Sequence, residues 1–96
     1  SPPIKIEKAC YNINTNDAEI TIKRNVDDKI QISDLGFIIN SNSESTSFSC
    51  GEACGNCQIL KIAETKIYYF NENEKPSEVS VKINNCLIEN KNIIGC

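Results

Sequence analysis

Apolar and polar residues alternate along most of this chain, with the period of two that is typical of a half-buried β-strand. Residues 35–39 depart from this pattern because they are apolar in succession, which predicts a strand covered on both faces. Alternating or otherwise strand-like runs occupy residues 4–11, 19–23, 29–33, 46–48, 58–62, 66–70 and 78–83. The pattern therefore predicts a protein built mainly of short strands.

Clusters of Asn, Ser and Asp separate these runs and predict turns. Asn84-Asn85 fits a two-residue hairpin turn, because Asn tolerates the positive φ that such turns require. This turn would place Ile83 opposite Cys86. A second polar group, residues 90–92, predicts another reversal of the chain just before its last residues.

Only residues 59–65 offer a helical period, and this stretch is short and flanked by strands. Seven or eight short strands with turn-rich connections predict an antiparallel, immunoglobulin-like β-sandwich. The length of 96 residues suits one domain, residues 1–96, with a modest core that benefits from covalent cross-links.

Composition narrows the functional classes. The net charge is −3 and the chain has one arginine and scattered lysines, which argues against a nucleic-acid partner. No apolar run reaches 18 residues, so we expect no membrane contact by this segment. Histidine is absent, which excludes Ser–His–Asp and Cys–His nucleophiles, and no phosphate-cradling motif is present. We therefore expect a protein that is not an enzyme, with no catalytic residues and no cofactor.

Six cysteines in a chain this short predict a disulfide framework and an oxidising, extracellular compartment. They are Cys10, Cys50, Cys54, Cys57, Cys86 and Cys96. If residues 90–92 form a turn, Cys86 and Cys96 face each other across a hairpin and can bond. At most one bond can close within residues 50–57. The third cysteine of that loop is then expected to bond Cys10.

The dense loop also admits alternative interpretations. Cys50, Cys54 and Cys57 have the spacing of a radical-enzyme iron–sulfur motif, but the chain is too short for the barrel that such enzymes require. Cys54 and Cys57 are also spaced as in a zinc knuckle or a redox-active dithiol. A zinc site on Cys50, Cys54 and Cys57, or thiol–disulfide exchange by this loop, is the alternative to a purely structural role.

The order of the segments resembles a known group of surface proteins. An opening Ile-Glu-Lys-Ala-Cys-Tyr is followed by Ile-Thr-Ile-Lys-Arg-Asn-Val-Asp and Ile-Ser-Asp-Leu-Gly-Phe-Ile-Ile. Ala-Glu-Thr-Lys-Ile-Tyr-Tyr-Phe, Glu-Lys-Pro-Ser-Glu-Val-Ser-Val and a closing Gly-Cys complete the pattern. Together these segments, which cover most of the chain, resemble the extracellular β-domains of archaeal type IV pilin-like and archaellin-like surface proteins.

The resemblance implies a non-catalytic structural or adhesive module at the cell surface. Proteins of that group polymerise through an N-terminal hydrophobic helix, which this sequence does not contain. The chain is therefore expected to be the head domain of a filament subunit, with other protein subunits as its partners, including copies of itself through such a helix. The loop of residues 50–57 has no counterpart in the family pattern.

Overall fold

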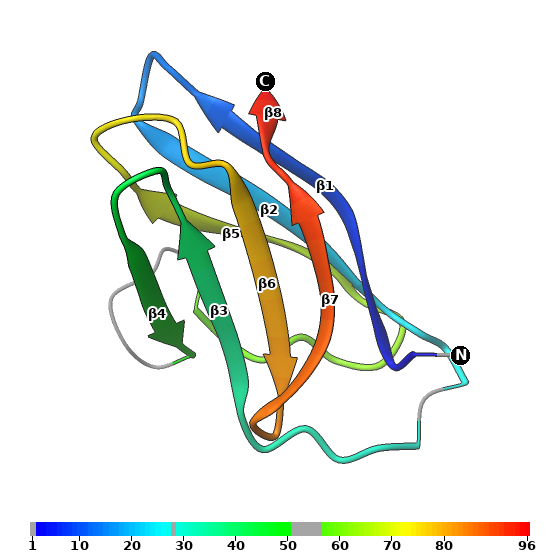
Figure 1. Ribbon diagram of the computed structural model, residues 1–96. Helices are drawn as coiled ribbons and strands as arrows, with labels where there is room; N and C mark the ends of the chain where they lie inside the picture. Colours follow the sequence, from blue (N-terminus) through cyan, green and yellow to red (C-terminus); the bar gives the residue numbers. More distant parts are fainter. Residues whose placement is uncertain (1, 28, 51–56) are drawn as a thin grey trace.

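The computed structural model describes residues 2–27, 29–50 and 57–96. These residues form eight strands and no helix, and the strands make two four-stranded sheets that face each other (Figure 1). The strands are β1 (Ile4–Asn12), β2 (Asp17–Arg24), β3 (Leu35–Asn40), β4 (Ser45–Ser49), β5 (Thr65–Asn71), β6 (Glu78–Ile83), β7 (Cys86–Asn92) and β8 (Ile94–Gly95). The all-β sandwich expected from the sequence is confirmed.

The first sheet has the strand order β5-β2-β1-β8, and the second has the order β4-β3-β6-β7. In constant-type immunoglobulin domains the fourth strand lies in the sheet of the first, second and fifth strands. Here β4 pairs instead with β3. The strand order thus establishes a two-sheet sandwich and leaves the immunoglobulin-like assignment a prediction.

Alternation of side chains builds the core between the sheets. In β2 the residues at every second position point inward, and Ala18, Ile20 and Ile22 are fully buried. β5 follows the same rule, with Tyr68 and Phe70 in the core while Ile67 and Tyr69 are about one-third exposed. The aromatic run of β5 therefore serves mainly the core, as its alternation predicts.

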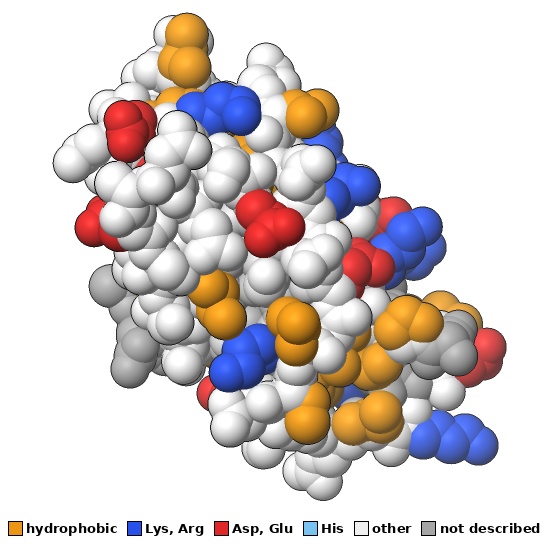
Figure 2. Space-filling model, in the orientation of Figure 1, with side chains coloured by type: hydrophobic (Ala, Val, Ile, Leu, Met, Phe, Trp, Pro, Cys, Tyr) orange, Lys and Arg blue, Asp and Glu red, His pale blue; other side chains and the backbone are white. Residues whose placement is uncertain are grey.

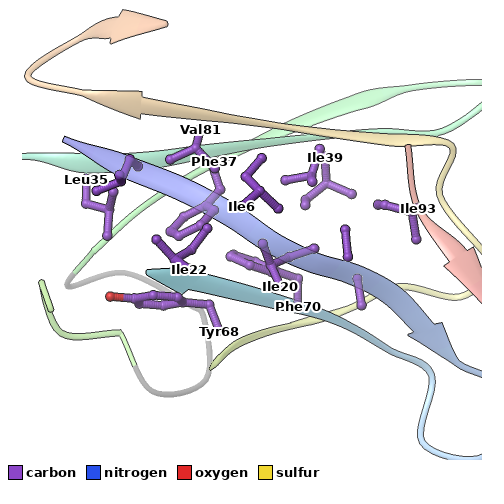
Figure 3. Packing of buried hydrophobic residues seen from close by; sticks show 14 of the residues in the cluster. Ile6, Ile20, Ile22, Leu35, Phe37, Ile39, Tyr68, Phe70, Val81 and Ile93 are labelled. Atoms are coloured by element: carbon purple, nitrogen blue, oxygen red, sulfur yellow. The ribbon is translucent and has the colours of Figure 1, made fainter. Parts of the chain in front are cut away.

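Phe37 of β3 lies at the centre of an aromatic cluster that joins the two sheets (Figure 3). Its ring centroid is 4.9 Å from those of both Tyr68 and Phe70, and the rings are tilted against each other. Phe48 of β4 extends the cluster, also at 4.9 Å from Phe70. Tilted pairs at this separation stabilise a core beyond the area that they bury. The strand predicted to be covered on both faces is thus central to the packing.

Two runs predicted as strands are irregular segments at one end of the sandwich. Residues 29–33 and 58–62 each contribute a single buried side chain, Ile32 and Leu60 respectively. The guanidinium of Arg24 donates hydrogen bonds to the carbonyls of Leu60 at 2.9 Å and Ile30 at 2.8 Å. The Arg24 side chain therefore links both irregular segments to the end of β2.

The hairpin at Asn84-Asn85 is confirmed, because these residues have φ of 50° and 68° and Ile83 pairs with Cys86. The turn expected at residues 90–92 is wrong. These residues continue β7 along β6 as far as Asn92. The chain then crosses to the other sheet, where β8 pairs with β1 in parallel. Figure 1 shows the C-terminus beside the end of β1.

Candidate functional site

A disulfide between Cys10 and Cys96 joins the end of β1 to the residue that follows β8. The bonded cysteines are 86 positions apart in the sequence, and their Cα atoms are 4.9 Å apart. The strand pairing of Cys10 with Ile94 brings them together, and the Cys96 amide donates to the Tyr11 carbonyl at 3.1 Å. The disulfide thus fixes the last strand of the chain to the first.

This bond corrects the predicted connectivity. Cys86 is free and exposed in the structure, so the expected Cys86–Cys96 bond is wrong, and Cys10 does not bond the 50–57 loop. The reason is the continuation of β7, which keeps the chain extended for roughly 20 Å after Cys86. Cys86 and Cys96 therefore lie toward opposite ends of the sandwich rather than across a hairpin.

The loop cysteines are only partly described. Cys50 carries a free thiol, Cys57 takes part in a disulfide, and Cys54 lies outside the described residues. The Cys57 sulfur also lies 3.7 Å from the Ser49 carbonyl oxygen. A sulfur already bonded to another sulfur is not a thiolate ligand. In this state, therefore, the described part of the loop presents one free thiol to a metal rather than the three thiolates of the zinc alternative.

Burial controls the chemistry of Cys50. Desolvation, assisted by the nearby Asp34 carboxylate, raises the pKa of its thiol from 9.0 to about 11, although Lys66 acts in the opposite direction. Burial, and to a smaller extent Cys50, also raises the pKa of Tyr68, whose hydroxyl donates to the Gln58 carbonyl. Because the thiolate is the reactive form of cysteine, Cys50 is a weak nucleophile at neutral pH.

Glu19 is brought to the disulfide by strand pairing. In the first sheet Cys10 lies directly opposite Glu19, and Glu19 lies opposite Tyr69 of β5. Directly opposed residues share one face of a sheet, and here this is the outer face. A carboxylate oxygen of Glu19 and the sulfurs of Cys10 and Cys96 all lie within 4.8 Å of one another.

Sequence reasoning missed this cluster, although the first hairpin carries a signal for it. Runs 4–11 and 19–23 are joined by a short polar turn, so the register that buries the apolar residues of both strands also places Cys10 opposite Glu19. The Asn12 side chain supports the arrangement, since its amide donates to the Glu19 carboxylate at 3.3 Å. Nothing in the local sequence indicated that Cys96 lies beside Cys10 and Glu19.

A polar depression of about 300 Å³ lies where the β3–β4 turn meets the start of the β5–β6 connection. Its lining includes the carboxylates Glu44, Glu72 and Glu74. Burial, and then the Glu44 charge, raises the pKa of Glu72. The fold thus brings Glu44 of the β3–β4 turn beside Glu72 and Glu74 of the β5–β6 connection.

A more apolar groove of about 500 Å³ lies at the opposite end, near the start of the chain. Pro2, Ile4 and Val26 line it together with the lysines of positions 5 and 23. Figure 2 shows hydrophobic side chains gathered over the part of this face where the N-terminus lies in Figure 1. Glu89, which also lines the groove, accepts a hydrogen bond from the Ile6 amide at 2.7 Å and so links the two sheets.

Comparison with known proteins adds no relative: no family model matches the chain, and neither does a curated protein or a solved structure. Within the described residues there is no helix long and apolar enough to cross a membrane.

Proposed function

We propose that this protein is a non-catalytic, extracellular structural or adhesive module of a cell surface. The observation that carries the proposal is the Cys10–Cys96 disulfide, which ties the first strand of the sandwich to the last. Disulfides persist in oxidising compartments and are rare in the reducing cytosol. A small sandwich whose chain ends are cross-linked is suited to withstand unfolding outside the cell.

Within this class, we infer the head domain of an archaeal pilin-like filament subunit, on the strength of the sequence resemblance. The start of the described chain is compatible with it, because Pro2 is exposed at one end of the sandwich. A helix that polymerises in a filament core would join the domain at that end without disturbing the packed sheets. The partners are then other subunits of the same filament.

The alternative role, thiol–disulfide exchange or zinc binding by residues 50–57, has less support. Exchange requires a thiol with a lowered pKa, and burial raises the pKa of Cys50 to about 11. The other free thiol among the described cysteines, Cys86, lies in the β6–β7 hairpin and has no described cysteine beside it with which to form a redox pair.

Localisation on intact cells of the producing organism tests the proposal. Antibodies raised against residues 1–96, carried on gold particles, are expected to label unpermeabilised cells, and labels arrayed along filaments would support the pilin-like assignment. A membrane-impermeant maleimide should modify the exposed Cys86 on the same cells, and a Cys86→Ser strain serves as the control. Labelling that appears only after permeabilisation would overturn the extracellular assignment. Surface labelling without filaments would overturn the filament assignment alone.

A further inference from the structure

The Cys10–Cys96 disulfide and Glu19 bring two sulfur atoms and one carboxylate together on the outer face of the first sheet. Cys10 and Glu19 come from β1 and β2, which pair along almost their whole length. Their relative position is therefore set by the framework of the sheet. Cys96 is exposed and follows a strand of only two residues, so it is the member of the cluster that can adjust its position.

We propose that this cluster is a redox-gated zinc site, in which Cys10, Cys96 and Glu19 bind Zn²⁺ once the disulfide is reduced. Thiolates and carboxylates are zinc ligands, and three protein ligands leave a fourth, tetrahedral position for water. Bound zinc would then replace the disulfide as the cross-link between β1 and β8. The cross-link at the chain ends is thus a disulfide under oxidising conditions and a metal bridge under reducing ones.

The chemistry balances with a dithiol as the reductant. The dithiol transfers two electrons and two protons to the disulfide, and it closes to a disulfide itself while Cys10 and Cys96 become thiols. Zinc then displaces the two thiol protons into solvent as the thiolates bind it. Glu19 binds through a carboxylate oxygen, a step in which no group is oxidised or reduced.

The required movements are small. Zinc–ligand distances of about 2.0–2.3 Å place the ligand atoms of a tetrahedral site roughly 3–4 Å apart. The three donor atoms already lie within 4.8 Å of one another, so the sulfurs have to separate while the carboxylate moves slightly inward. The Asn12 amide, which donates to Glu19 at 3.3 Å, would orient the carboxylate from outside the ligand shell.

A variant that keeps only the relevant thiols gives a direct test. Cys50, Cys54, Cys57 and Cys86 are replaced by Ser, the protein is reduced with dithiothreitol, and the reductant is removed by anaerobic gel filtration. We expect the reduced protein to bind one equivalent of Co²⁺, with a thiolate-to-cobalt absorption band, and to exchange it for Zn²⁺. The oxidised protein should bind none. Failure of the reduced, folded variant to take up metal would overturn the proposal.

Three further substitutions test whether Glu19 is a zinc ligand or contributes only its negative charge. Glu19→Gln should weaken Zn²⁺ binding by about tenfold or more, and Asn12→Ala should weaken it by about tenfold through loss of orientation. Asp17→Asn removes a carboxylate two residues away on the same face of β2 and should leave the affinity unchanged. Equal affinities for the Glu19→Gln and Asp17→Asn proteins would show that Glu19 is not a ligand.

The full chain provides a second readout if the four-serine variant does not fold. Reduction is expected to lower the Tm of the wild-type protein, and Zn²⁺ should raise the Tm of the reduced protein again. The Zn²⁺-dependent rise should be lost in Cys10→Ser and should be smaller in Glu19→Gln. A rise as large as that of the wild type in both variants would locate the metal elsewhere and overturn the proposal.

Discussion

The side-chain oxygen of Asn84 accepts hydrogen bonds from the backbone amide and the hydroxyl of Ser33, at 2.9 and 3.0 Å. The same oxygen accepts from the Asp34 amide at 3.2 Å, and the side-chain amide of Asn84 donates to the Gln31 carbonyl at 3.0 Å. Asn84 also begins the β6–β7 turn, with φ of 50°. One residue therefore both turns the hairpin and holds the irregular segment that precedes β3.

Replacing Asn84 by alanine is expected to lower the free energy of unfolding by about 1–3 kcal/mol. The variant loses these hydrogen bonds, and alanine has no polar side chain to stabilise the left-handed conformation that asparagine tolerates. Urea denaturation measures the loss. Asn84→Gly separates the two causes, because glycine accepts the positive φ but makes no side-chain hydrogen bond. Asn85→Gly is the matched control and should change stability little. An Asn84→Ala protein as stable as the wild type would contradict this account.

Removal of the Cys10–Cys96 bond by the double substitution Cys10→Ala and Cys96→Ala should lower the free energy of unfolding by about 4–5 kcal/mol. The chain-entropy model gives this magnitude for a closed loop of this length, because the bonded cysteines are 86 positions apart in the sequence. Cys86→Ala, which removes an exposed free thiol, should change stability by about 0.5 kcal/mol or less. Peptide mapping without reductant should recover the Cys10–Cys96 pair, and a Cys86–Cys96 pair would contradict the structure.

Arg24→Lys should lower the free energy of unfolding by about 1–3 kcal/mol, although the charge is kept. A lysine ammonium cannot reach two separate carbonyls with the planar geometry of the guanidinium, so at least one charged hydrogen bond to Leu60 or Ile30 is lost. In this variant, backbone amide hydrogen exchange should be faster than in the wild type in residues 29–33 and 58–62, with little change in the strands. Lys23→Ala, on the exposed face of β2, is the control. Uniform acceleration across both sheets would show that Arg24 does not act locally.

Alkaline pH should destabilise the fold through Cys50 and Tyr68. The pKa of Cys50 is about 11 in the folded protein and 9.0 ordinarily, and the pKa of Tyr68 is raised as well. The folded state thus holds protons that the unfolded state has released, so this stability is full below pH 9.0 and falls as pH rises through about 11. Urea midpoints measured at rising pH should decline less steeply in Cys50→Ala than in wild type. Cys86→Ala should decline as the wild type does, and identical slopes for all three proteins would refute the role of Cys50.

Several elements of this fold follow from local sequence alone. Alternation in residues 4–11, 19–23, 66–70 and 78–83 predicts the strands β1, β2, β5 and β6, because a half-buried strand must place every second residue in the core. The Asn84-Asn85 turn follows for the same kind of reason, since few residues other than glycine tolerate its dihedral angles. These features depend on interactions between residues that are near in the chain.

Contacts between residues that are distant in the sequence decided the other features of the fold. Residues 29–33 alternate as clearly as true strands do, yet the guanidinium of Arg24 binds the Ile30 carbonyl and none of the described strands pairs with this segment. Pairing with β6 keeps β7 extended through residues 90–92, where local composition favours a turn. The chain therefore crosses to the other sheet before it ends, and Cys96 meets Cys10 and Glu19 instead of Cys86. Local pattern determined which segments form most of the strands, whereas the cysteine pairing and the sulfur–carboxylate cluster arose from contacts across the whole length of the chain.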